Sequence, residues 1–377
     1  MKKALISWFA FLPLLAMAQV PEPSPAAGTG IAPMPLRYEI RVTLDPAQKM
    51  LHGQETIHWT NATRDTVPDI WFHLYWNAFK NEKSAFMQEA RQEDFGADMH
   101  GDTDVKDGDW GWIDVDAIRL KDGADLKPTL EFMVPDEPRH PEDQTVMRVK
   151  LPKALAPGEA VDLEISFQAK IPRTVRRSGY YHDGYFIGQW FPKPGVYQEG
   201  KGWNCHQYHL NSEFFADFAD FKVHITVPEK FVVGAAGREV AASRDAKAGT
   251  VTHTFTQERI HDFAWTADPD YLRLERDFVA AREVSEAEYR EVAGALRLPV
   301  DQVRLPDVKM ILLINPEHRS QAERHFQALR AALKYYGLWY GPYPYAQVTM
   351  VDPPFRSGAG GMEYQTLFTA GTRVLPS

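Results

Sequence analysis

Five residues near the C-terminus, Gly360-Gly361-Met362-Glu363-Tyr364, place one carboxylate directly after a pair of glycines. Because glycine has no Cβ, the backbone here can come close to a second chain, as it does at a strand edge. An extended peptide can add to such an edge through main-chain hydrogen bonds. Glu363 would then attract an α-amino group, which is mostly cationic at neutral pH because its pKa is about 7.7 to 8.0. The pattern predicts a site for the free amino end of a peptide; a glycine-rich turn with a solvated glutamate is the alternative.

The elements that position this segment are mainly strands. From Leu36 to Leu44 every second residue is apolar, with charged or polar residues between them, which is the period of a half-buried strand. The same alternation returns at 161–167, 221–227 and 251–255. These runs predict a large antiparallel β domain, of sandwich or saddle form, over residues 34–270.

Helical signals begin after this region. Ser285 and Glu288 form a capping box that predicts a helix through about Leu296, within a helical connection over residues 271–303. Val308 to Ile314 is nearly continuously apolar, as in a strand covered on both faces, and residues 347–351 predict another strand. Between them, Asn315-Pro316 marks a helix start. The apolar positions that follow predict one buried helical face that Gly337 can end: Ala322, Phe326, Leu329, Leu333 and Tyr336.

The N-terminus has the form of an export signal. Lys2 and Lys3 precede an apolar run, and Ala16-Met17-Ala18 supplies small residues at a cleavage position, so residues 1–18 predict a signal peptide and a periplasmic or secreted protein. Residues 19–33 are rich in proline, alanine and glycine and predict a flexible tether. The formal net charge of −9 disfavours nucleic acid and anionic lipid as partners. The single cysteine, Cys205, excludes an intrachain disulfide and is expected to be a buried, small apolar residue.

The C-terminal motif resembles the Gly-x-Met-Glu-Asn signature of the aminopeptidase N family, the M1-type zinc metallopeptidases. The residues before it match, in order, the run that precedes the catalytic helix in that family. Landmarks of the family's N-terminal β domain also occur, so that the resemblance spans most of the chain: Gln189-Trp190-Phe191-Pro192, Glu213-Phe214, Val223 to Pro228, His261-Asp262-Phe263-Ala264-Trp265, and Trp339 to Tyr345.

The resemblance implies that residues 304–377 are the start of a thermolysin-like catalytic domain. It also implies an exported zinc aminopeptidase in which Gly360, Gly361, Met362, Glu363 and Tyr364 bind a peptide with a free N-terminus. Gln189 is a further candidate for the substrate amine, since many family members use a β-domain glutamine or glutamate there, although its spacing to Phe191 differs from the expected pattern. Tyr364 stands where better-known members have asparagine.

The family's zinc ligands have no counterpart in this sequence. No His-Glu-x-x-His occurs in the 377 residues, so no catalytic or metal residue is assigned, and the chain is expected to be inactive alone even with zinc present. Cys205-His206-x-x-His209 is not expected to bind a metal, because in an extended stretch positions 206 and 209 point to opposite faces. Two other interpretations stay open: a non-catalytic β module that binds peptide or glycan through its aromatic residues, and a relative without zinc.

Overall fold

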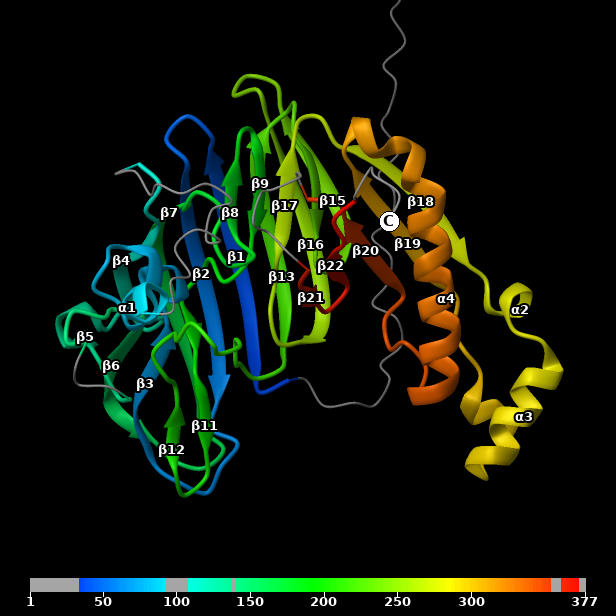
Figure 1. The fold of residues 1–377 in the computed structure, drawn as a ribbon. Coiled ribbons are helices and arrows are strands. Elements are labelled where there is room, and N and C mark those ends of the chain that lie inside the picture. Colours follow the sequence, from blue (N-terminus) through cyan, green and yellow to red (C-terminus); the bar gives the residue numbers. More distant parts are fainter. Residues whose placement is uncertain (1–33, 93–107, 137–139, 354–360, 373–377) are drawn as a thin grey trace, which may run out of the picture. The chain divides into compact units, whose positions relative to one another are not determined.

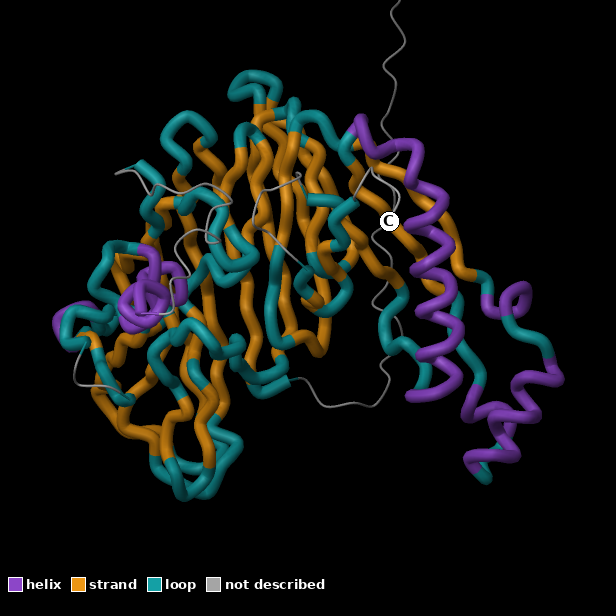
Figure 2. The backbone as a smooth tube through the Cα atoms, in the orientation of Figure 1, coloured by secondary structure: helices purple, strands orange, loops and turns teal. Residues whose placement is uncertain are grey.

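The computed structural model describes residues 34–92, 108–136, 140–353 and 361–372 (Figure 1). Strands dominate this part of the chain (Figure 2), which confirms the mostly β fold class. In β1 (Leu36–Asp45), the alternate side chains predicted to face the core are all buried. The strands predicted at 161–167, 221–227 and 251–255 are also present.

A seven-stranded sheet is the largest among the described residues. It is antiparallel except where β1 and β13 pair in parallel. In spatial order its strands are β15 (Arg238–Asp245), β16 (Thr250–Ile260), β13 (Ala219–Pro228), β1, β2 (Met50–Thr60), β7 (Ala160–Lys170) and β4 (Trp112–Leu120).

Smaller sheets accompany it. One contains β10 (Lys193–Pro194), β3 (Val67–His73), β6 (Val146–Leu155) and β5 (Glu131–Phe132). Another contains β14 (Val232–Ala235), β17 (Trp265–Asp268), β9 (Gly184–Ile187) and β8 (Gly179–Tyr181). A two-stranded ribbon is formed by β11 (Val196–Gln198) and β12 (Gly202–Asn204).

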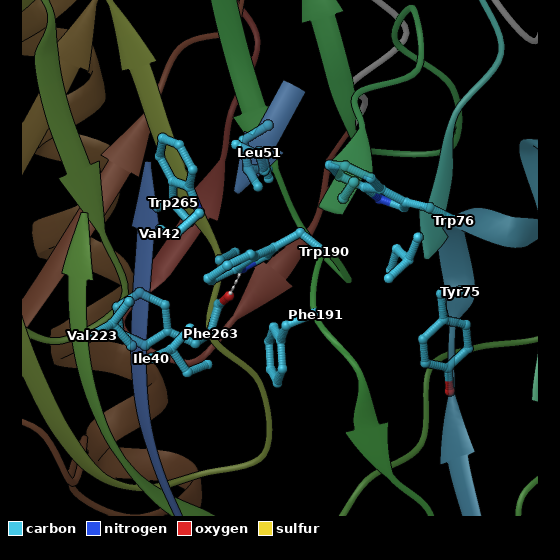
Figure 3. Close-up of a cluster of buried hydrophobic side chains, with 14 of the residues drawn as sticks. Ile40, Val42, Leu51, Tyr75, Trp76, Trp190, Phe191, Val223, Phe263 and Trp265 are labelled. Carbon is cyan, nitrogen blue, oxygen red and sulfur yellow. Dashed lines mark hydrogen bonds between the residues drawn. The ribbon is translucent and has the colours of Figure 1, made fainter. Parts of the chain in front are cut away.

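Large aromatic side chains join these layers into one hydrophobic core (Figure 3). Trp190, Phe263 and Trp265 are fully buried among side chains of the seven-stranded sheet such as Ile40. The indole N–H of Trp190 donates to the carbonyl of Phe263 at 2.9 Å, so its one polar atom is satisfied inside the core.

The C-terminal part of the described chain forms a five-stranded sheet whose central strands are buried on both faces. Its strands, in spatial order, are β18 (Leu272–Phe278), β19 (Val308–Ile314), β20 (Gln347–Val351), β22 (Leu367–Thr369) and β21 (Glu363–Tyr364). Ile311 and Leu313 belong to the same hydrophobic core as the seven-stranded sheet, whereas Met310 and Leu312 pack with helix α4 (Ala322–Tyr340). This two-sided burial explains the continuous apolar run of β19.

Helices are few and mostly short in the described residues. The capping box of Ser285 and Glu288 is present at the start of α3, as predicted. The helices other than α4 are η1 (Tyr75–Phe79), α1 (Ala85–Gln92), η3 (Lys127–Thr129), α2 (Ala280–Glu283), α3 (Glu286–Leu296), η4 (Val300–Val303) and η5 (Pro316–Gln321). None that the structure describes is both long and apolar enough to cross a membrane.

Two details of the prediction for α4 are wrong. The helix continues past Gly337 to Tyr340, and Tyr336 faces solvent instead of the core. Gly337 takes the buried position, because a Cβ there would lie 2.7 Å from a methyl carbon of Leu305. Glycine is needed at this position because Leu305 packs closely against it. The hydrophobic periodicity of the helix does not reveal this contact.

Candidate functional site

Glu363 lies on the edge strand of the five-stranded sheet. Strand β21 pairs antiparallel with β22 on one side, and no other strand in the described part of the chain pairs with it. Gly361 and Glu363 are exposed, whereas Met362 and Tyr364 are buried, so the alternation of a strand continues through this short segment. Gly360 lies outside the described residues.

Asp352, at the end of β20, ties together the carboxyl ends of the neighbouring strands. It is completely buried and accepts hydrogen bonds from three elements. The donors are the Asn315 backbone N–H after β19 at 3.3 Å, His318 Nδ1 in η5 at 2.6 Å, and the Thr372 backbone N–H after β22 at 2.9 Å. Asp352 therefore precedes the segment that carries Glu363 and also binds the backbone that follows β22. Its buried carboxylate has its hydrogen bonds satisfied.

Tyr364 packs strand β21 against β9. Its ring is buried near Phe186, with the ring centroids 6.1 Å apart. A Cβ at Gly188 would lie 2.2 Å from the Tyr364 hydroxyl oxygen, so glycine is required for this approach. The hydroxyl interacts with Gln189, and burial raises the Tyr364 pKa well above its usual value. Gln189 itself has a left-handed φ of 58°.

Gln189 belongs to a buried polar network. Its amide N–H donates to Asp262, and its carbonyl oxygen accepts from Lys193 Nζ at 2.8 Å. Lys193 also forms a salt bridge of 2.8 Å with Asp262, and both side chains are almost fully buried. The structure thus brings Gln189 and Tyr364 together, as part of the support beneath β21.

Arg177 and Glu213 are two residues near Met362 that the sequence analysis did not single out as site residues. Arg177 Nη1 is 2.8 Å from Glu213 Oε2 and 3.1 Å from Met362 Sδ. The hydrogen bond to Glu213 is the main cause that raises the pKa of Arg177, and the charge of Glu363 adds to it. The only sequence signal was the Glu213-Phe214 landmark, because nothing in the chain connects residue 177 with residue 362.

Arg177 is presented by an unusual turn. Val175 and Ser178 pair as a two-residue hairpin, in which Arg176 and Arg177 have φ values of 41° and 68°. Such turns normally use asparagine or glycine, because a left-handed backbone costs other residues about 1 kcal/mol or more. The turn directs Arg177 toward Met362 despite this strain.

The described residues do not form a zinc site: no group of three histidine, cysteine or carboxylate side chains among them could hold a metal ion. Cys205 is buried, as predicted. The prediction that His206 and His209 point apart is wrong, because both reach Asp136: His206 Nδ1 lies 2.5 Å, and His209 Nε2 3.5 Å, from its oxygens. They lie in a loop rather than a strand, so alternation does not apply.

One cavity among the described residues lies away from this segment. It measures about 720 Å³ and lies where the seven-stranded sheet meets the Pro344–Gln347 stretch. Charges of both signs line it, including Arg37, Glu39 and Lys222. No residue of the Gly361–Tyr364 segment contributes to it, so this cavity is separate from the candidate site.

Comparison with known proteins places the fold. No family model matches the sequence, and no curated protein matches it. Among solved structures, an M1 zinc metallopeptidase from Deinococcus radiodurans with bound Tyr-Ser-Ala substrate is similar, at 15% identity and a TM-score of 0.51 over 89% of this chain and 60% of that one. A two-domain M1 zinc metallopeptidase with bound L-arginine matches at 15% identity and a TM-score of 0.51, over 90% of this chain and 62% of its own.

The chain thus spans about three fifths of the length of these solved structures. At this level of identity, the similarity concerns the fold. The described residues have the fold of the N-terminal part of M1 zinc metallopeptidases.

Proposed function

We propose that this chain is the N-terminal portion of an exported, zinc-dependent metallopeptidase of the aminopeptidase type. Residues 1–18 act as the signal peptide, residues 34–270 as the β domain and residues 304–377 as the start of the catalytic domain. The observation that carries the proposal is Glu363: an exposed carboxylate on the edge strand of a fold shared with M1 zinc metallopeptidases.

The substrate is a peptide with a free N-terminus. It adds to the open edge of β21, where Gly361 lets its backbone approach, and its ammonium group pairs with Glu363. The side chain of Glu213 is 69% exposed and is held by Arg177 beside Met362. Glu213 therefore supplies a second carboxylate from the β domain, and Gln189 contributes by supporting Tyr364 from below.

Zinc belongs to the complete protein in this proposal. Because the described residues do not fit a metal site, its ligands must come from residues beyond them. The residues of this chain bind and orient the peptide. The edge strand β21 sets the register of the peptide, and the carboxylates of Glu363 and Glu213 bind its charged amino end.

The experiment uses the complete coding sequence. The reading frame that continues beyond Ser377 is expected to encode His-Glu-x-x-His, followed by a further glutamate about 18 residues after it. In the complete protein, Glu363→Gln removes one charge-assisted hydrogen bond worth about 1.5–3 kcal/mol, so kcat/KM on free-amine peptides should fall roughly 10- to 150-fold. Zinc content should not change.

The matched control is Glu323→Gln, which alters an exposed glutamate at the start of α4 and should leave activity unchanged. N-acetylated peptides serve as the second control. An equal loss of activity on free and acetylated peptides would contradict the role of Glu363. Continuous coding sequence without a zinc motif would instead indicate a binding module or a zinc-less relative.

A further inference from the structure

Glu213, the second carboxylate of the proposed peptide site, lies at the end of a loop over residues 206–213. These residues form neither a strand nor a helix, so their backbone groups have no ladder of regular hydrogen bonds. Arg177 binds the side chain of Glu213 at 2.8 Å. The backbone of the loop must be held in place by other groups.

Two carboxylates from distant parts of the chain hold this backbone. Asp136 Oδ2 accepts a hydrogen bond from the Gln207 N–H at 2.8 Å. Glu89 Oε2, in helix α1, accepts one from the Leu210 N–H at 2.7 Å. Hydrogen bonds to an ionised carboxylate are stronger than those between neutral groups, so Asp136 and Glu89 are the anchors of the loop.

The ring of His209 lies between the two anchors. Its Nδ1 is 2.6 Å from Glu89 Oε1, and its Nε2 is 3.5 Å from Asp136 Oδ2. A neutral imidazole has one N–H and can donate to only one of these carboxylates, whereas the protonated ring donates to both. The protonated ring also offsets the repulsion between the two negative charges.

The two carboxylates favour the protonated ring. Burial by itself lowers the pKa of His209, but the hydrogen bonds and charges of Glu89 and Asp136 outweigh burial and raise this pKa above its usual value. The side chain of His209 is 25% exposed, so water screens part of this attraction.

The other titratable or charged side chains that flank this part of the loop, in the described structure, come from the loop itself and from the Val175–Ser178 hairpin: His206, Glu213, Arg176 and Arg177. Glu213 and Arg177 form an ion pair and add no net charge. His206 Nδ1 lies 2.5 Å from the second oxygen of Asp136. Arg176 donates to the Leu210 carbonyl at 3.1 Å and, as a cation, opposes the protonation of His209. The contacts that favour the charged ring are therefore those to the two anchors.

We propose that His209 is a positioning residue of the peptide site: its protonated ring joins Glu89 to Asp136 and thereby holds the loop that carries Glu213. The role of Glu213 in peptide binding rests on the proposed function, whereas the effect of His209 on the loop can be measured without a peptide. When His209 loses its proton, one of its two contacts is lost and the loop becomes less ordered. Peptides with a free N-terminus then bind more weakly.

The pH interval follows from the direction of the pKa shift. Because the pKa of His209 is higher in the folded protein than in the unfolded chain, the contribution of its contacts is fully present below about pH 6.5. It is lost as pH rises through the folded pKa. The loop is therefore best ordered on the acidic side of this interval.

The first measurement is an NMR titration of the full chain without a peptide. The ¹⁵N signals of the His209 ring should titrate above about pH 6.5. Over the same interval, the protection of the Gln207 and Leu210 amides against hydrogen exchange should fall roughly two- to tenfold, because partly exposed ion pairs contribute modestly. A ring that stays neutral throughout, or amide protection that does not follow the titration of the ring, would overturn the proposal.

Two variants sharpen this test. His209→Gln should lower the protection of the loop amides at low pH and remove its dependence on the pH interval. Glu89→Gln keeps an acceptor for the Leu210 N–H but removes one charge beside His209, so the ring should titrate at lower pH. An unshifted titration in Glu89→Gln would overturn the proposal, and this result does not require that His209→Gln folds.

The matched control is His58→Gln. His58 forms a similar pair with Asp162 on the seven-stranded sheet, at 2.7 Å and with a side chain that is 27% exposed. This variant should leave the protection of the Gln207 and Leu210 amides unchanged. An equal loss of protection in His58→Gln would show that the loop responds to general destabilisation, which would contradict a specific role of His209.

The second measurement connects the loop with the peptide site. The probes are tri-alanine with a free N-terminus and N-acetylated tri-alanine, each titrated into the unmodified chain and His209→Gln at a pH below and a pH above the His209 titration. Below it, the variant should bind tri-alanine roughly two- to tenfold more weakly, and above it the two proteins should bind equally. A difference of the same size at both pH values would indicate a merely structural role and overturn the proposal.

The acetylated probe separates this inference from the proposed function. It should bind both proteins equally, because it has no charged amine for Glu213 to attract. If both probes bind the unmodified chain equally while the loop amides respond as expected, the proposed function is wrong, and the positioning of the loop by His209 is confirmed.

Discussion

His73 should make the stability of this protein depend on pH in a way that one substitution removes. The ring titrates near pH 6.5 in the unfolded chain, whereas burial lowers its pKa to about 3 in the folded protein. Between these values the unfolded chain binds a proton that the folded one does not, so the free energy of unfolding decreases as pH falls below about 6.5. From pH 7 to pH 5, the loss from this group is about 2 kcal/mol.

His73→Phe should remove that loss and leave the contributions of the other histidines in place. The measurement is urea unfolding, followed by tryptophan fluorescence, of both proteins at pH 7 and pH 5. The unmodified chain should lose about 2 kcal/mol more than the variant over this interval. The comparison between the two proteins matters, because many groups titrate in this range in both.

Tyr75→Phe is the control, since it alters the ring stacked on His73 without changing a group that titrates between pH 5 and 7. It should shift stability by the same amount at both pH values. If His73→Phe and the unmodified chain lose the same stability on acidification, the folded ring is not held neutral.

Three further perturbations test the supports of the candidate site and one helix end. Lys193→Met leaves the buried carboxylate of Asp262 without its cation, so the free energy of unfolding measured by chemical denaturation should fall by about 3–5 kcal/mol. Adding Asp262→Asn to this variant should restore much of the lost stability. If Lys193→Met alone is neutral, the network is not a buried ion pair. Gly188→Ala forces a Cβ to within 2.2 Å of the Tyr364 hydroxyl oxygen. Amide hydrogen exchange should therefore become faster in β21 and β22 and stay unchanged in the seven-stranded sheet. Unaltered exchange in β21 and β22 would show that Tyr364 does not hold the edge strand. Arg297 is the C-cap of α3 and has a left-handed backbone, which glycine adopts without strain. Arg297→Gly should therefore stabilise the protein by roughly 0.5–1 kcal/mol in thermal unfolding. A destabilised variant would mean that contacts of the arginine side chain outweigh its backbone strain.

Strong local patterns predicted much of the fold. The alternation from Leu36 to Leu44 identified β1, and the capping box identified the start of α3, because each depends on residues close together in the chain. The continuous apolar run of β19 correctly indicated burial on both faces. The end of α4 was misjudged, because a glycine can end a helix or fill a tight contact, and only the position of Leu305 distinguishes the two.

The candidate site was only partly visible in the sequence. The motif pointed to Glu363, and the structure places it on an exposed strand edge. Its surroundings come from distant parts of the chain: Arg177 and Gln189 approach Met362 and Tyr364 across more than 150 residues. No periodicity or spacing relates such positions.

The sequence by itself therefore indicated several of the strands, the start of α3, the apolar face of β1, and the place where a lone carboxylate follows a glycine pair. The tertiary structure decided that, among the described residues, Glu363 lies on an edge strand, that Arg177 joins Glu213 to the neighbouring Met362, and that the buried ring of His73 has no hydrogen-bond partner. The physical reason is the distance along the chain over which each interaction acts. Backbone propensity and hydrophobic period act over a few residues, whereas sites are assembled by the packing of sheets whose strands are far apart in the chain.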